Sequence, residues 1–504
     1  MSVVAPDHHI DTAAWNVIQH WHDHVPGQTV YDGIDYADLV KWYLWDKVGA
    51  FYRSQVGGDA FAFEQQLAPP AKESPWLAVT KIKLAVKACR KELQRHADAG
   101  SRGGLANTLT RQGQDSGKAA RLVFIPFPTP RTQPLTKELI AVGYRVVTND
   151  TPAYLGSRNP PERTGRAINR LAALHRAGHL SATVATSLAA QGVPLPSGAR
   201  HRLLRQLFEQ QRIIQQAEAE INAFGPDCLL LHGDNHSPYQ EYVAVAHKYE
   251  IPTVTFQHGL ECERYYLDKV FATHYAVWSR SRHDQIRVMN PARPVMLAIT
   301  GNPAYDQCQY PRAIDHWGRY WLWLTRPHRP RYCYAPSRQP REGVDIFNAL
   351  VQALVRHPHD RLVIKPHPND YADVYRDLTR RSPCMDRIEI SSKTIGELVP
   401  DARLVISEDS TAGVEAMFSG KIIVHAHFAM CQPVLKLTDF AAALPGFATE
   451  QLIDSLGVAL SLDVPARQRM LDGQIACLDH YAGPLDGHSG LRQREFLLSL
   501  VGSH

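Results

Sequence analysis

Two stretches in the second half of the chain join an apolar run to a polar loop whose side chains can bind an anion. One reads RLVIKPHPND and the other RLVISEDSTAGVEAMFSGKIIV. The first loop carries Lys365 and His367, and the second carries Ser410 and Thr411 at the start of an expected helix. Cations, hydroxyls and helix N-termini all favour phosphate. If the two runs are neighbouring parallel strands, their loops meet and form a cradle for a nucleotide phosphate.

Each of these residues also has an ordinary structural explanation. The prolines on either side of His367 fix their own φ angles, so the imidazole could simply pack against a stiff turn. Ser410 could serve only as an N-cap, which explains one hydroxyl but not the adjacent Thr411. Glu415, one turn into the expected helix, could accept hydrogen bonds from ribose hydroxyls or face solvent. Ser337 and Arg338 follow the apolar run 332–336 and are expected at the same crevice.

Two further loops in the first half are candidates for the reacting groups. The sequence HGDNH follows the apolar run 228–231, and QHG follows the run 253–256. Asp234 is expected at the mouth of the crevice, opposite the phosphate loops, where a carboxylate can act as a base or a nucleophile. Gln257 and His258 are expected to orient the donor or the acceptor.

Other assignments of the same loops are weaker. Asp234 could instead cap the helix that follows it. His232, His236 and His258 could bind zinc together with an aspartate, but they lie on separate loops, so we expect no metal. The sequence contains no GxSxG, GxxxxGK[ST] or GxGxxG pattern, which excludes the usual serine-hydrolase, P-loop and dinucleotide sites.

The elements that must position these loops alternate between strand and helix. Apolar runs of four to six residues separated by helical patterns predict two successive α/β units with a ligand crevice between them. We expect a helical N-terminal region over 1–120, a first Rossmann-like domain over 121–310, a second over 311–485 and a C-terminal helix over 486–504. The segment 310–331 is expected to cross between the domains, and 332–336 to be the first strand of the second domain.

Composition excludes several classes of protein. The chain has 504 residues, 44% hydrophobic and 21% charged, with a net charge of +5, which is ordinary for a globular protein and does not indicate nucleic-acid binding. No apolar run is long enough to cross a membrane, and the N-terminus does not resemble a signal peptide. Eight scattered cysteines are typical of reduced thiols, so we expect a cytoplasmic protein. The basic run KIKLAVKACRKELQR could touch an anionic membrane or form a solvated helix face.

From about Asp227 to Lys421 the chain resembles GT-B glycosyltransferases of bacterial capsule and lipopolysaccharide synthesis. The resemblance lies in the HGDNH, QHG, TGNPAYD, KPHP and SEDSTAGVEAMFSGK segments. His367-Pro368 and Ser410-Thr411 look like the HP and SS/T motifs of enzymes that use CMP-activated ulosonic acids. The fold implied is α/β, with GT-B-like twin Rossmann domains and an additional helical N-terminal region.

The resemblance implies glycosyl transfer from a CMP-linked sugar acid, most simply Kdo (3-deoxy-manno-octulosonic acid), to a glycan or glycolipid acceptor. In these families the two motifs bind CMP and an N-domain carboxylate reacts, a position that Asp234 matches best. The order Gly-Asp-Asn departs from the acidic motif of sialyltransferases and favours the Kdo type. A CDP-glycerol or UDP-sugar transferase of the same fold, or a non-catalytic scaffold for polysaccharide assembly, remains an alternative. No further cofactor is implied.

Overall fold

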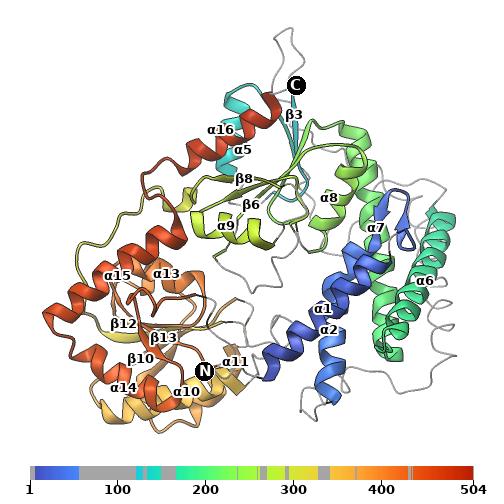
Figure 1. Cartoon of the computed structure of the whole chain (residues 1–504). Coiled ribbons are helices and arrows are strands. Elements are labelled where there is room, and N and C mark those ends of the chain that lie inside the picture. Colours follow the sequence, from blue (N-terminus) through green and yellow to red (C-terminus); the bar gives the residue numbers. More distant parts are fainter. Residues whose placement is uncertain are drawn as a thin grey trace, which may run out of the picture.

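Two six-stranded sheets, each built of parallel strands, form the frame of the protein (Figure 1). The computed structural model describes residues 6–25, 27–55, 121–128, 133–148, 166–234, 236–257, 259–260, 270–289, 295–326, 341–368, 370, 372–428, 433 and 435–502. The basic run considered as a membrane contact lies outside these residues. The expected α/β architecture with twin Rossmann-like sheets is confirmed.

The first sheet has the strand order β4-β3-β5-β6-β7-β8, and every neighbouring pair is parallel. Its strands are β3 (Leu122–Ile125), β4 (Arg145–Thr148), β5 (Cys228–Leu231), β6 (Thr253–Phe256), β7 (His274–Val277) and β8 (Met296–Ile299). Helices α5 (Gln133–Ala141), α8 (Tyr239–Lys248) and α9 (Arg280–Met289) connect them. The chain order reverses between β3 and β5, which is the switch point where ligands of such sheets bind.

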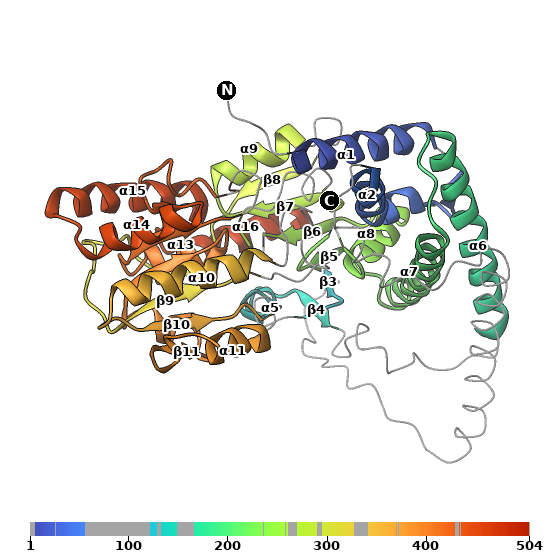
Figure 2. The same cartoon turned by 90° about the horizontal axis from the view of Figure 1, so that it is seen from below.

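The N-terminal helices share one apolar core with the first sheet. Helices α1 (Pro6–His24) and α2 (Tyr36–Gln55) flank a short hairpin of β1 (Val30–Tyr31) and β2 (Ile34–Asp35). They pack beside the long helices α6 (Arg166–Ala190) and α7 (Ser197–Phe224), as Figure 2 shows. Because Trp21 is fully buried in the cluster that also contains Phe124 of β3, this region is continuous with the first domain.

The second sheet has the order β11-β10-β9-β12-β13-β14 and is again entirely parallel. Its strands are β9 (Tyr320–Leu324), β10 (Leu362–Lys365), β11 (Ile388–Ile390), β12 (Ala402–Ser407), β13 (Ile422–Ala426) and β14 (Leu444–Gly446). The flanking helices are α10 (Arg341–Arg356), α11 (Ala372–Arg380), α12 (Ile395–Leu398), α13 (Thr411–Met417), α14 (Thr449–Leu460) and α15 (Val464–Ala482). The switch point lies between β9 and β12.

The start of the second sheet differs from the sequence-based expectation. We expected 310–331 to be a crossover, but β9 lies within it and pairs with both β10 and β12 at the centre of the sheet. Trp321 and Trp323 are fully buried there. Arginines and prolines on both sides of the YWLWL run obscured a strand that is apolar on both faces, as expected for a buried parallel strand. The run 332–336 lies outside the described residues.

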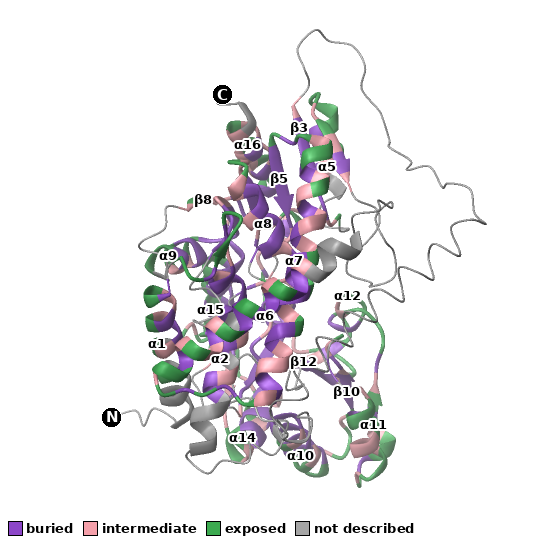
Figure 3. Ribbon diagram, turned by 90° about the vertical axis from the view of Figure 1, so that its right-hand side faces the viewer, coloured by how far each residue is buried: buried purple, intermediate pink, exposed green. Residues whose placement is uncertain are grey.

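The end of the chain returns to the first sheet. Helix α16 (Ser489–Gly502) packs beside α5 in Figure 1, and Leu497 is fully buried among β3 and β5 side chains. The central strands of both sheets, such as β5 and β12, are buried, whereas the edge strand β8 is partly exposed, as Figure 3 shows by colour. None of the described helices combines the length and apolarity needed to cross a bilayer.

Candidate functional site

A cavity of about 880 Å³ lies where the carboxyl ends of the two sheets face each other. We refer to it as the crevice. Its described lining comes from both domains and contains most of the loops singled out by sequence: Leu135, Glu138, His232, Phe256, Gln257, Trp278, Asn302, Pro303, Ala304, Asp306, Gln307, Leu324, Thr325, Lys365, Pro366, His367, Pro368, Ile395, Ser410, Thr411, Ala412, Glu415, Gly490 and Gln493. This volume is within the range of small-molecule sites.

The KPHP loop reaches the crevice from the end of β10. Its backbone is held by a buried network, because the His367 N–H donates to Thr325 Oγ1 (3.0 Å) and Thr325 Oγ1 donates to Asp370 Oδ2 (3.0 Å). Lys365 Nζ donates to the Pro366 carbonyl (3.3 Å), so the ammonium stays near its own loop. Burial lowers the pKa of His367 below its ordinary value, which favours the uncharged imidazole.

The EDST loop follows β12 and divides its four side chains between support and site. Glu408 Oε1 accepts from the indole of Trp323 (3.2 Å), and Asp409 accepts from His425 Nε2 (3.1 Å). These two acidic residues therefore hold the loop onto the sheet. Ser410 and Thr411 are left to line the crevice.

Ser410 occupies the N-cap position of α13, but its side chain makes no capping bond. Its Oγ is buried and has no hydrogen-bond partner among the described residues. A buried hydroxyl without a partner costs free energy, and a ligand oxygen in the crevice would satisfy it. Simple N-capping therefore does not explain this residue.

The second hydroxyl of the pair joins the two domains. Thr411 Oγ1 accepts the N–H of Leu260 (3.2 Å), which lies just after the QHG loop of the first sheet. Glu415, one turn further along α13, accepts from the Tyr305 hydroxyl (3.0 Å) with Oε1. Burial and the neighbouring Glu415 raise the pKa of Tyr305. The QHG and EDST loops are thus brought together, as the sequence indicated, and α13 docks against the first domain.

Gln257 lines the crevice, but its side-chain amide is hydrogen-bonded to backbone groups. Its Oε1 accepts from the Trp278 N–H (2.7 Å), and its Nε2 donates to the Gly259 carbonyl (2.7 Å). The side chain therefore links the backbone just after β6 to the backbone just after β7. His258, Ser337 and Arg338 lie outside the described residues.

Asp234 is not where we expected it. Its side chain is only 4% exposed and is absent from the crevice lining. Oδ2 accepts the backbone N–H groups of Phe271 (2.9 Å) and Ala272 (3.0 Å), just before β7. The expectation that it stands at the crevice mouth is corrected, because these two amides hold the carboxylate in the interior. Its neighbour His232 lines the crevice instead.

Sequence reasoning missed other polar groups of the lining, above all Glu138 on α5 and Gln493 on α16. Glu138 lies on an amphipathic helix with no motif around it. Gln493 lies about 190 residues beyond Gly301, whose carbonyl its Nε2 approaches at 3.5 Å, so only the folded chain brings it to the crevice. The spacing of Leu135 and Glu138 on one helix face was the single available signal for Glu138.

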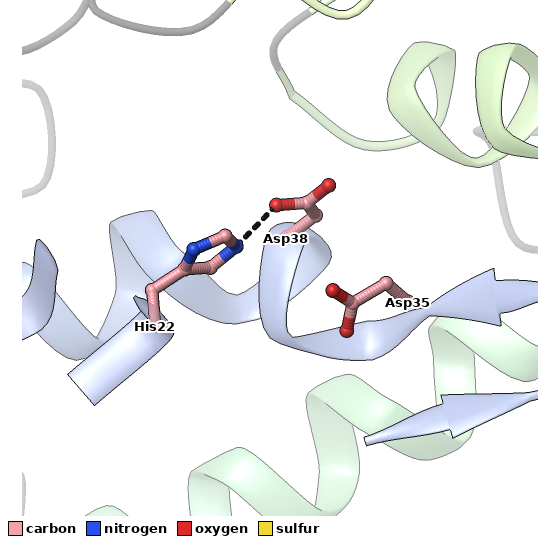
Figure 4. Close-up of side chains that lie close together, drawn as sticks. All are labelled: His22, Asp35 and Asp38. Atoms are coloured by element: carbon pink, nitrogen blue, oxygen red, sulfur yellow. Dashed lines mark hydrogen bonds and ion pairs between the residues drawn. The ribbon is translucent and has the colours of Figure 1, made fainter. Parts of the chain in front are cut away.

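One group of side chains outside the crevice has the composition of a metal site. His22, Asp35 and Asp38 place one ligand atom each within 4.8 Å of one another (Figure 4). Asp38 already bonds His22 Nε2 (2.6 Å), and Asp35 Oδ1 accepts from Thr29 Oγ1 (2.8 Å) and the Ala37 N–H (2.9 Å). These bonds tie α1 to the start of α2 and explain why the three side chains gather.

Comparison with known proteins finds likenesses of structure only. No protein-family model matches the chain, and no curated protein sequence matches it. The S. aureus protein MnaA with UDP is 14% identical over 76% of this chain and 97% of its own, with a TM-score of 0.47. UDP-GlcNAc 2-epimerase from Neisseria meningitidis is 12% identical over 75% and 100%, with a TM-score of 0.45. A UDP-forming trehalose-phosphate synthase from Burkholderia vietnamiensis is 11% identical over 76% and 100%, with a TM-score of 0.41.

Proposed function

We propose that the crevice binds a nucleotide-activated sugar and transfers the sugar to an acceptor. The observation that carries this proposal is the Ser410 hydroxyl, which is buried at the crevice wall without a partner among the described residues. It lies in the same cavity as Lys365 and His367, at the switch point of a parallel sheet. A phosphate placed there would receive a hydroxyl, an ammonium and an imidazole N–H.

These groups suit the departure of a nucleotide. Negative charge grows on the phosphate oxygen when the bond to the sugar breaks, and donors already held in place stabilise that charge without rearranging. Lys365 contributes a positive charge. His367 and the hydroxyls of Ser410 and Thr411 contribute hydrogen bonds. Thr411 accepts from Leu260 and so keeps its own hydroxyl hydrogen for the ligand.

A CMP-linked sugar acid such as CMP-Kdo is the first candidate donor. Lys365 is the one lysine or arginine in the described lining of the crevice, which fits a donor with a single phosphate better than a diphosphate. The acceptor in this case is a glycan or glycolipid, reached from the first-domain side of the crevice.

A UDP-sugar is the second candidate, and a different feature favours it. The described lining contributed by the first domain and α16 contains Glu138 and Asp306 but no lysine or arginine. The carboxylate of a sugar acid would lack a cation there, whereas carboxylates accept hydrogen bonds readily from the hydroxyls of a neutral sugar. The phosphate-facing part of the crevice therefore favours the CMP donor, and the sugar-facing part favours the UDP-sugar.

Thermal unfolding with added nucleotide tests the proposal and separates the donors. We expect CMP or UDP at millimolar concentration to raise the melting temperature, since a ligand that binds only the folded chain stabilises it. Ser410→Ala should weaken this binding about tenfold, corresponding to the loss of one hydrogen bond to a charged group. Ser419→Ala, at an exposed serine after the same helix, is the matched control.

Turnover then identifies the sugar. Purified protein is incubated with CMP-Kdo or UDP-GlcNAc, and release of free nucleotide is measured. Nucleotide release from one donor that falls with Ser410→Ala supports transfer chemistry. Absence of any shift with CMP, CDP or UDP would contradict the proposal and favour a non-catalytic role in polysaccharide assembly.

A further inference from the structure

Three described carboxyl groups line the crevice, and two of them already have structural partners. Asp306 accepts the N–H groups of Ser489 (2.9 Å) and Gly490 (3.0 Å), so it caps the start of α16. Glu415 accepts from the Tyr305 hydroxyl. Glu138 differs, because its Oε2 is buried and has no hydrogen-bond partner among the described residues.

The fold holds Glu138 firmly at this place. It lies on α5 three residues after Leu135, which also lines the crevice, and next to Leu139, which is fully buried. Leu139 packs with Leu497 of α16 and with the strands β3 and β5. Helix α5 is therefore fixed against the sheet, and the face that carries Glu138 is turned to the cavity.

The position of Glu138 in the topology is also that of a reacting group. Helix α5 follows β3, and His232 follows the adjacent strand β5, so both residues flank the switch point of the first sheet. Lys365 and Ser410, which we propose bind the phosphate, follow the strands β10 and β12 on either side of β9 in the second sheet. A donor with its phosphate on the second sheet extends its sugar toward the first.

We propose that Glu138, rather than Asp234, is the general base that activates the acceptor; this rests on the proposed sugar transfer. Glu138 takes the proton from the acceptor hydroxyl as the acceptor oxygen bonds to the anomeric carbon. The bond from that carbon to the donor phosphate breaks, and the electron pair leaves with the nucleotide. Asp234 is not available for this step, since its carboxylate holds two backbone amides away from the crevice.

The experiment compares Glu138→Gln and Glu138→Ala with the wild-type chain and with Glu450→Gln, an exposed glutamate outside the crevice. Nucleotide release from CMP-Kdo and UDP-GlcNAc is measured with water as acceptor, and the melting temperature is measured with and without CMP and UDP. We expect Glu138→Gln to lower turnover at least 100-fold, as for loss of a general base, and to keep the nucleotide-induced stabilisation. Formate added to Glu138→Ala should restore part of the turnover, which a purely structural role would not allow.

The possible outcomes separate this inference from the proposed function. If Glu138→Gln retains turnover within threefold of wild type, or loses nucleotide binding, Glu138 is not the base. If Asp234→Asn, measured where it is still folded, loses turnover while Glu138→Gln keeps it, the roles are reversed and the inference is overturned. A wild-type chain that binds no nucleotide, or binds it without releasing any from either donor, contradicts sugar transfer itself.

Discussion

The loops of the two sheets place carboxylates at equivalent positions but surround them differently. Asp409 follows β12 and accepts from His425 Nε2 and His427 Nδ1 (3.2 Å). Burial pushes its pKa upward, but the bonds and charges of the two histidines together hold the pKa well below the ordinary value. Asp234 follows β5 and accepts backbone amides. In the second sheet the carboxylate therefore holds the EDST loop through histidine side chains, whereas in the first sheet the expected reacting carboxylate is bonded to backbone amides.

A third buried carboxyl extends the comparison. Glu241 lies on α8, is fully buried, and has a pKa raised to about 7, chiefly by burial. Asp409 is equally inaccessible but has two histidines against it. Burial alone does not decide the charge of a carboxyl group, because the hydrogen-bond donors around it decide whether the ion is tolerated.

The largest effect is expected at Asp409. Asp409→Ala removes the acceptor for His425, which is fully buried, and for the Leu435 N–H (3.1 Å). We expect the free energy of unfolding to fall by about 4 kcal/mol, which is within the range for breaking a buried ion pair. Urea unfolding followed by circular dichroism measures the change, with the exposed Asp454→Ala as control. A loss below about 1 kcal/mol would mean that the histidine cluster does not support the EDST loop.

The second largest effect is expected for Asp234→Ala. The free energy of unfolding should fall by about 3 kcal/mol, because two buried amides lose their acceptor at about 1–3 kcal/mol each. The same urea experiment measures it, and the exposed Asp386→Ala serves as control. Unchanged stability would show that Asp234 is not holding the chain before β7, and would restore it as a candidate reacting group.

The raised pKa of Glu241 predicts that the stability of the protein depends on pH. Its pKa is higher in the folded chain than in the unfolded chain, so its contribution to stability is present below the ordinary pKa of 4.5 and is lost as pH rises through about 7. Glu241→Gln removes this loss. We expect the free energy of unfolding of the variant, relative to that of the wild type, to rise on the order of 2 kcal/mol from pH 5 to pH 8.5. Urea unfolding at both pH values measures this difference. An equal stability difference at the two pH values would indicate that Glu241 titrates normally.

The smallest effect concerns the glycine of the EDSTAG segment. A Cβ at Gly413 would collide with the Ser407 side chain of β12, so α13 can approach the sheet only with glycine here. We expect Gly413→Ala to cost about 1.5 kcal/mol and to weaken nucleotide binding by displacing Ser410. Gly457→Ala on α14 is the matched control, because its Cβ meets nothing within 4 Å and should be neutral or stabilising. Equal melting temperatures for the two variants would contradict this close packing.

The sequence predicts the α/β units well where strands are bounded by clear helical patterns. The apolar runs 228–231 and 253–256 coincide with the strands β5 and β6. The sequence-based prediction is wrong at β9, because five apolar residues between arginine- and proline-rich segments look like part of an irregular connection between domains. Which strand becomes central depends on pairing partners about 40 and 80 residues away.

The sequence predicts polar loops at the ends of apolar strands, and it predicts that Lys365, His367, Ser410 and Thr411 line one crevice, because parallel strands bring their carboxyl ends to one edge. It could not decide which polar groups remain for a ligand. That depended on contacts between distant segments, which bonded Asp234 to the chain before β7 and turned Glu138 from an unremarked helix toward the crevice. Motif and spacing identify groups capable of chemistry, while the folded chain determines which of them already have partners.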